Sequence, residues 1–183
     1  MLNKKGLWYD ASEEILASAT FLKENASEIQ NESLSIAKKL SGKLPFLYSD
    51  DALGAVLVRF QQQINENAKQ ICHVNVFPEM NHNELVGWVN PNQVLKNSLV
   101  LIFESLADHP RVRVRMDVCE PIFNRFCETL RIKGVGKTNL EQVLYLIHLT
   151  DWISYDLALE NNVDPFPVEI INHLKGELAK HNL

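Results

Sequence analysis

The chain has 183 residues and a formal net charge of −5, and 46% of its residues are hydrophobic and 22% charged. This length suits a single domain, and the composition excludes a largely disordered or collagen-like chain. The chain has only 7 glycines, which disfavours an all-β fold with many tight turns.

The same totals limit where the protein works and what it binds. A negative net charge gives no general electrostatic basis for nucleic-acid binding, and no apolar run reaches the ~18 residues of a membrane span. The three cysteines, Cys72, Cys119 and Cys127, are unclustered, as is typical of reduced thiols in a cytosolic protein. We therefore expect a cytoplasmic protein with neither a nucleic-acid nor a membrane partner.

Helical and extended patterns alternate along the chain. The continuous apolar strand segments predict a mostly parallel sheet covered on both faces, in one α/β domain over residues 1–183. The expected helices span residues 12–22, 28–40, 51–70, 83–89, 114–127 and 138–161, with a last helix ending near 180. The expected strands span residues 43–48, 71–77, 99–103 and 129–135.

Two phosphate-binding patterns are incomplete or ambiguous. Residues 134–138 read Gly-Val-Gly-Lys-Thr, but a P-loop needs a glycine where Arg131 stands. We expect instead a turn followed by a helix start, because Thr138 and Glu141 match the capping box. The alternating residues Arg111, Arg113 and Arg115 would face one side of an extended chain, either gripping a phosphate or forming a solvated rim.

Residues 59–69 form the first segment with specific polar chemistry. At 100° per residue, Leu53, Phe60 and Ile64 make the core face of this helix, and Arg59 and Glu66 fall on the opposite side. Taken alone, such a polar side is more often a solvated helix face.

The second such segment, residues 77–88, follows a predicted strand. Ligands bind open α/β sheets in the crevice beyond the carboxyl ends of the strands, and this segment carries Asn81, His82 and Glu84. Trp88 could wall a pocket there, although a histidine at a strand end is often only a surface residue. Glu79, His82 and Glu84 lack a metal-binding pattern, so we predict no metal site.

Together the two segments carry a family resemblance. The run Gln-Ile-Asn-Glu-Asn-Ala-Lys at 63–69 and the run Pro-Glu-Met-Asn-His-Asn-Glu at 78–84 resemble the bifunctional phosphoglucose/phosphomannose isomerases of the sugar isomerase (SIS) superfamily. Residues 36–45, 108–112, 151–155 and 164–175 are similar to further parts of that family. The resemblance implies a three-layer α/β/α sandwich, SIS-like and flavodoxin-like, and it extends from about residue 12 onward.

The family has two SIS halves, and this chain resembles only the second. The first half supplies a phosphate-binding segment of the kind S-x-S-G-x-T, which this sequence lacks. The resemblance implies as partners the missing N-terminal SIS half, a hexose 6-phosphate and a second copy of the chain in a homodimer. The chain is either a piece of such a protein or a half-protein that works with a partner.

The resemblance also assigns roles to residues. It implies that Glu66 is the base that moves a proton between C1 and C2, and that His82 opens the sugar ring and is lent across the dimer interface. A carboxylate can accept and return one proton, and imidazole can protonate a ring oxygen near neutral pH. It further implies that Lys175 holds the open-chain sugar.

Other residues are expected to support these three. Arg59 and Asn81 are candidates for binding substrate, although Arg59 could also form a structural ion pair. Glu79 and Glu84 could contact the catalytic side chains without touching the substrate. Lys175 is expected at the edge of a core-facing stripe made of Ile170, Ile171, Leu174 and Leu178.

The predicted function is a cofactor-free and metal-independent aldose–ketose isomerase that interconverts fructose 6-phosphate with glucose 6-phosphate and mannose 6-phosphate through a cis-enediol. Because the first half is missing, this chain alone could be inactive. The rival hypothesis is a non-catalytic SIS module that binds sugar phosphate or mediates dimerisation. A third alternative is a structural scaffold whose polar clusters are unused.

Overall fold

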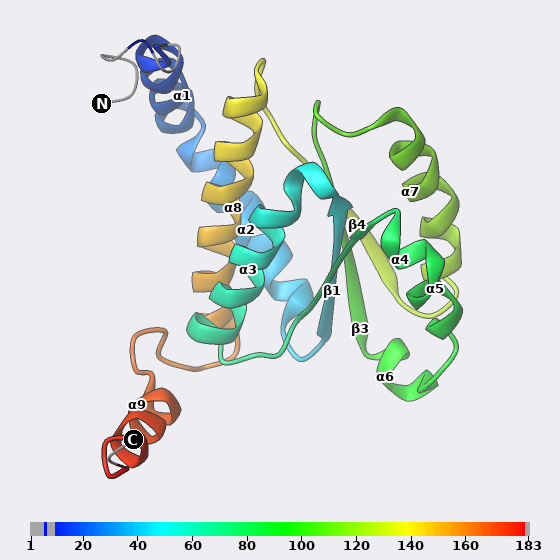
Figure 1. The fold of residues 1–183 in the computed structure, drawn as a ribbon, viewed down its shortest axis with the longest axis vertical. Helices are drawn as coiled ribbons and strands as arrows, with labels where there is room; N and C mark the ends of the chain where they lie inside the picture. The colour runs from blue at the N-terminus through cyan, green and yellow to red at the C-terminus, as the bar shows by residue number, and fades with distance from the viewer. Residues whose placement is uncertain (1–5, 7–9, 182–183) are drawn as a thin grey trace.

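The computed structural model describes residue 6 and residues 10–181 (Figure 1). Its centre is a parallel sheet with the strand order β2-β1-β3-β4. The strands are β1 (Leu44–Asp50), β2 (His73–Phe77), β3 (Ser98–Glu104) and β4 (Glu128–Lys133). The predicted parallel sheet is confirmed, with strand boundaries that shift by at most two residues.

Helices cover both faces of the sheet. On one face lie α1 (Ser12–Glu24), α2 (Ala26–Leu40), α3 (Gly54–Asn67) and α8 (Asn139–Glu160). On the other lie α4 (Glu79–His82), α5 (Glu84–Gly87), α6 (Asn92–Lys96) and α7 (Pro110–Phe123). A short 3-10 turn, η2 (Asp51–Leu53), links β1 to α3, and α9 (Glu169–Leu178) lies outside these layers. The fold is therefore the expected three-layer α/β/α sandwich.

Successive side chains of the central strands β1 and β3 point to opposite faces of the sheet, and a separate hydrophobic core lies on each face. Leu47 and Leu101 belong to the core beneath α2, α3 and α8, together with Phe60 of α3. Tyr48 and Ile102 point the other way, into the core beneath α7. Successive side chains of a strand face opposite sides, so residues adjacent in sequence stabilise different layers.

The predicted core face of α3 is confirmed, because Leu53, Phe60 and Ile64 are fully buried. The capping box is also confirmed: the backbone N–H of Glu141 donates to Thr138 Oγ1, and the Glu141 carboxylate accepts from the backbone N–H of Thr138. Within the described residues, no helix combines the length and the apolar character needed to cross a membrane.

The expected start of the helix at residue 114 is wrong, since α7 begins at Pro110. His109 caps the helix by accepting a hydrogen bond from the backbone N–H of Arg111, and a proline at the first helical position already has a helical φ angle. The arginines from 111 to 115 are therefore helical and not extended: Arg111 and Arg115, four residues apart, share one side of the helix, and Arg113 lies on another. The short helix α6 has no counterpart among the elements expected from the sequence.

The last helix differs most from expectation. The predicted core stripe on α9 is wrong in this chain, because Ile170, Ile171, Leu174 and Leu178 are all exposed. Figure 1 shows α9 projecting from the end of the molecule where α3 and α8 finish. Its sequence is amphipathic, but nothing in residues 10–181 covers the apolar side.

Candidate active site

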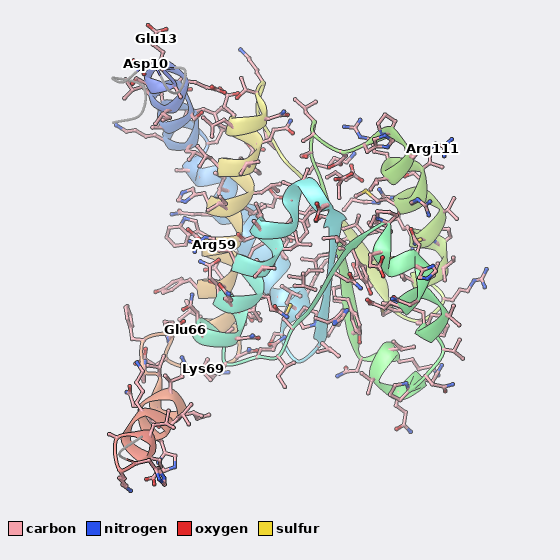
Figure 2. The ribbon with its side chains drawn as sticks, viewed as in Figure 1. Asp10, Glu13, Arg59, Glu66, Lys69 and Arg111 are labelled. Atoms are coloured by element: carbon pink, nitrogen blue, oxygen red, sulfur yellow. The ribbon has the colours of Figure 1, made fainter. Side chains whose placement is uncertain are left out.

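The outer face of α3 carries two of the predicted site residues. Arg59 and Glu66 both point away from the sheet, and Glu66 lies on the last turn of the helix (Figure 2). The Glu66 carboxylate makes no hydrogen bond or ion pair within the described part of the chain, while its backbone carbonyl accepts from Lys69 Nζ at 2.6 Å. A carboxylate on this surface is free to meet a substrate or a partner surface.

Arg59 is bound to α8 and not to Glu66. Its Nη2 donates to Asp151 Oδ1 at 2.8 Å, and Gln63 Nε2 donates to the same oxygen at 2.5 Å. Both members of the Arg59–Asp151 pair are more than a third exposed, so solvent weakens the interaction. The observed contact is the structural ion pair that the sequence left open as an alternative for Arg59.

The segment after β2 forms a compact helical turn. His82 ends α4, is exposed, and has no side-chain partner within the described residues. Asn81 is turned inward toward α7: its amide nitrogen lies 3.0 Å from Cys119 Sγ, and its Oδ1 accepts from Arg115 Nη1 at 3.3 Å. Asn81 therefore anchors the turn, whereas His82 projects from it.

Trp88 does not wall a pocket. Its indole is buried against Phe123, with ring centroids 4.6 Å apart, and its Nε1 donates to Tyr48 Oη at 3.1 Å. The tryptophan is part of the core between the sheet and α7.

The chain does not bring Glu66 and His82 together. Helix α3 packs with α8 on one face of the sheet, whereas α4 lies on the other face. The two residues are also at opposite ends of β2, since Glu66 precedes its first residue and His82 follows its last; five residues of strand span roughly 13 Å. One copy of this chain cannot present both groups to one small substrate.

Lys175 is equally separate, because it stands on the exposed helix α9. The connection to that helix passes the end of α3, where Lys69 Nζ donates to the carbonyl of Pro165 at 3.3 Å. The helix thus begins near the turn that bears Glu66, and its apolar side is exposed within the described part of the chain.

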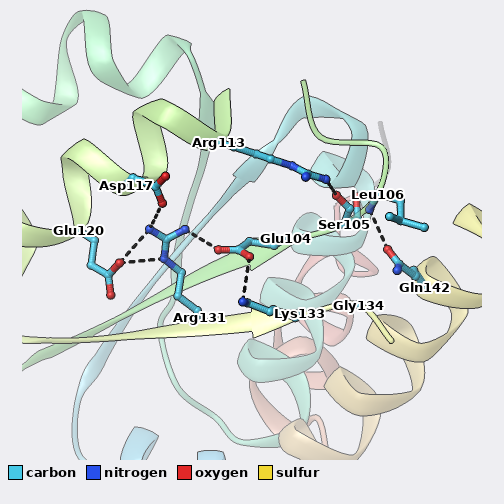
Figure 3. Close-up of a pocket in the computed structure, with 10 residues that line it drawn as sticks. All are labelled: Glu104, Ser105, Leu106, Arg113, Asp117, Glu120, Arg131, Lys133, Gly134 and Gln142. Carbon is cyan, nitrogen blue, oxygen red and sulfur yellow. Dashed lines mark hydrogen bonds and ion pairs between the residues drawn. The ribbon is translucent and has the colours of Figure 1, made fainter. Parts of the chain in front are cut away.

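The described cavities lie away from the predicted site residues. One of about 480 Å³ opens at the carboxyl ends of β3 and β4 (Figure 3). Its central Arg131 is held by Glu104, by Asp117 at 2.9 Å and by Glu120 at 2.8 Å. Arg131 alone offsets one of these three carboxylates, and Lys133, 3.8 Å from Glu104, and Arg113 supply the other two positive charges of the lining. None of the five predicted site residues lines any of the four described cavities.

Sequence reasoning missed the residues that hold Glu84. Its carboxylate is bound by Tyr48 of β1 and by His73 and Asn75 of β2. Polar side chains at alternate positions of an otherwise apolar strand were the available signal, since His73 and Asn75 then face the same side. Among the described residues, no group of three or more His, Cys, Asp or Glu could hold a metal ion.

Comparison with known proteins identifies the family. The pattern of the bacterial phospho-glucose isomerase C-terminal SIS domain matches residues 29–178, which is most of the chain. The chain belongs to this family. The resemblance stated from residues 63–69 and 78–84 is thereby confirmed.

Curated relatives of this SIS domain are about twice its length. It is 38% identical over 161 residues to the bifunctional phosphoglucose/phosphomannose isomerase of Aquifex aeolicus, covering 87% of this chain and 50% of the relative. It is 32% identical over 177 residues to the protein of the same name from Caldicellulosiruptor bescii, covering 93% of this chain and 52% of that one.

The fold of the SIS domain is also found in solved structures. A glucose-6-phosphate isomerase like protein from Thermus thermophilus superposes with a TM-score of 0.62 at 20% identity, over 76% of this chain and 46% of the other. At that identity the likeness establishes the fold alone. The chain spans about half the length of the proteins that it matches.

Proposed function

We propose that this SIS domain is the second half of an aldose–ketose isomerase that interconverts fructose 6-phosphate with glucose 6-phosphate and mannose 6-phosphate. The observation that carries the proposal is the match to bifunctional phosphoglucose/phosphomannose isomerases over most of the chain. A general phosphosugar isomerase role follows from the family; the named sugars and the mechanism are the proposal.

In the proposed mechanism Glu66 is the base. Its carboxylate takes the proton from C2 of the open-chain aldose and returns it to C1 of the enediol, which gives the ketose without a cofactor or a metal. The position of this carboxylate on the outer face of α3, with no partner among the residues that the structure describes, supports this role, because a base must be free to reach the proton that it abstracts.

The remaining roles need more than one copy of this domain. His82 protonates the ring oxygen during ring opening, and it comes from a second copy, since Glu66 and His82 lie on opposite faces of one chain. Lys175 holds the open-chain sugar, and a first SIS half supplies the phosphate-binding segment. Arg59 and Asn81 are less suited to direct substrate binding, because both are engaged with other side chains.

A second candidate function is a non-catalytic SIS module that binds sugar phosphate or mediates dimerisation. The separation of the predicted residues from the described cavities favours it. Such a module would bind hexose 6-phosphates without turning them over.

The deciding experiment measures conversion of fructose 6-phosphate by the chain alone and by the chain joined to the first half of the Aquifex aeolicus relative. We expect activity in the joined protein, retention of that activity in a chelator, and a loss of at least about 100-fold in kcat for Glu66→Gln. The control is Glu13→Gln, which makes the same change on exposed α1. No turnover by either folded protein would favour the binding module, and full activity of Glu66→Gln would remove Glu66 from the mechanism.

A further inference from the structure

The Glu84 carboxylate is the most heavily bound side chain near the proposed ring-opening residue. Oε1 accepts from the Tyr48 hydroxyl and lies 2.9 Å from His73 Nε2, and Oε2 accepts from Asn75 Nδ2 at 2.5 Å. These partners come from two neighbouring strands, β1 and β2. This carboxylate provides the polar attachment of the short helix α5 to the sheet, beside the apolar packing of Leu85 and Trp88.

The partners of Glu84 are themselves fixed. Tyr48 is fully buried, and its hydroxyl also accepts from Trp88 Nε1. The His73 ring packs on Phe46, with centroids 5.2 Å apart. Asn75 cannot turn its amide without loss, because its Oδ1 accepts from the backbone N–H of Val76 at 2.8 Å.

The network requires a carboxylate in particular. Burial by itself would raise the pKa of Glu84, but hydrogen bonds from His73, Tyr48 and Asn75 outweigh it and hold that pKa below its usual range. Tyr48 and Asn75 donate to the two acceptor oxygens, and His73 Nε2 donates to Oε1 when it carries the proton. A glutamine would have the same shape, but its NH₂ group would face a donor on one side.

The other end of the same turn is anchored independently. Asn81 contacts Cys119 and Arg115 of α7, as described above, and Met80 is fully buried. Asn83 breaks the helix between α4 and α5, with φ −131° and ψ −54°, and its Oδ1 accepts from the backbone N–H of Glu84. His82 thus lies, exposed like its neighbour Asn83, between two anchors, one on α7 and one on the sheet.

We propose that Glu84 is a positioning residue for His82, which fastens the α4–α5 turn to strands β1 and β2 so that the imidazole is presented at a fixed place. The inference rests on the proposed function, in which His82 opens the ring. A misplacement of about 1 Å can cost about 100-fold in rate, so loss of the anchor should reduce turnover even though Glu84 does not touch the substrate.

The first test uses the chain itself and needs no activity. Amide hydrogen exchange and the heteronuclear NOE are measured over residues 79–87 in the wild type, Glu84→Gln and Glu79→Gln. Glu79 is the matched control, because it is an exposed carboxylate on the same turn that accepts a hydrogen bond from Asn83 at 3.2 Å and does not reach the sheet. We expect about tenfold faster exchange and lower NOE values at His82 in Glu84→Gln alone, with β3 unchanged. An unchanged turn in Glu84→Gln would overturn the inference.

The second test separates positioning from general stability. Turnover of glucose 6-phosphate is measured for His82→Ala, Glu84→Gln and the double variant in the joined two-half protein. We expect Glu84→Gln to lower kcat about 10- to 100-fold with little change in KM. We also expect the double variant to lose no more than His82→Ala alone, because Glu84 acts through His82.

The outcomes distinguish the two proposals. If the losses of the single variants multiply in the double variant, Glu84 acts independently of His82 and the inference fails. If Glu84→Gln loosens the turn but His82→Ala keeps full turnover, the ring-opening role of His82 fails, and Glu84 positions no reacting group. A folded Glu13→Gln control with wild-type kcat shows that loss of a carboxylate is not in itself sufficient.

Discussion

The buried hydroxyl of Tyr48 allows a sharp test of the polar network beneath the α4–α5 turn. It donates to Glu84 and accepts from Trp88 Nε1 at 3.1 Å, and Tyr48 is fully buried. Burial raises the pKa of Tyr48, and the hydrogen bond to Glu84 raises it further, so the hydroxyl stays protonated and remains a donor. Tyr48→Phe removes only the oxygen and leaves the ring in place against Phe123.

The expected cost follows from the two hydrogen bonds. A hydrogen bond to a charged group contributes about 1.5–3 kcal/mol, and a buried N–H left without a partner costs about 1–3 kcal/mol. Trp88 is only 3% exposed, so water cannot readily replace the lost acceptor. Allowing for partial relaxation, we expect the free energy of unfolding to fall by about 2–4 kcal/mol, which is a large part of the usual ~5–15 kcal/mol.

Urea unfolding at pH 7, followed by tryptophan fluorescence and circular dichroism, measures this difference. The matched control is Tyr155→Phe, because Tyr155 is 41% exposed and its hydroxyl has no hydrogen bond within the described residues. The control should change the free energy of unfolding by less than about 0.5 kcal/mol. The slope against urea concentration should stay the same in both variants, since neither changes the surface exposed on unfolding.

One result would refute this reasoning. If Tyr48→Phe costs no more than Tyr155→Phe, with an unchanged slope, the buried hydroxyl contributes nothing net. The network would then not hold the turn in the way that the geometry indicates, and the positioning role of Glu84 would lose its physical basis.

Three further predictions concern other parts of the chain. The pKa of Glu84 is lowered in the folded state, so its carboxylate stabilises the fold above the ordinary Glu pKa of about 4.3. The difference in unfolding free energy between wild type and Glu84→Gln, measured in urea, should therefore shrink as the pH falls below that value. A difference that stays constant with pH would contradict this charge-based account. Leu101→Ala, at a fully buried position of β3, should lower the free energy of unfolding in urea by about 2–5 kcal/mol. Leu174→Asp on the exposed helix α9 should change this free energy by less than about 0.5 kcal/mol. A larger loss for Leu174→Asp would show that α9 is packed. Burial raises the pKa of Cys72 to about 12, so iodoacetamide at pH 8 should label this thiol far more slowly in the folded chain than in urea. Mass spectrometry measures the two labelling rates. Equal rates would show that the thiol is accessible in the folded chain.

Local sequence patterns were sufficient for most of the fold. The buried strand over 98–104 and the capping box at Thr138 were visible because apolar runs and helix caps depend on neighbouring residues. The start of α7 was misplaced because the cap there is a histidine followed by a proline, and the alternating arginines suggested an extended chain. The histidine–proline pair favours a helix start and the alternating arginines favour an extended chain, so two local patterns predict different structures for the same residues.

For the candidate site, too, some features follow from the local sequence and others depend on residues far apart in the chain. The sequence by itself determined the family, the core face of α3 and hence the outward placement of Glu66 and Arg59, because helical periodicity fixes which residues share a side. It could not show that Arg59 pairs with Asp151, since those residues are 92 positions apart in sequence.

Only the tertiary structure decided the rest. The sheet puts Glu66 and His82 on opposite faces, and it brings Tyr48 and His73 to the carboxylate of Glu84. It also leaves the amphipathic helix α9 uncovered, although its pattern predicts burial. Periodicity determines which side of a helix is apolar, but the surface that covers that side depends on how separate elements are arranged in space.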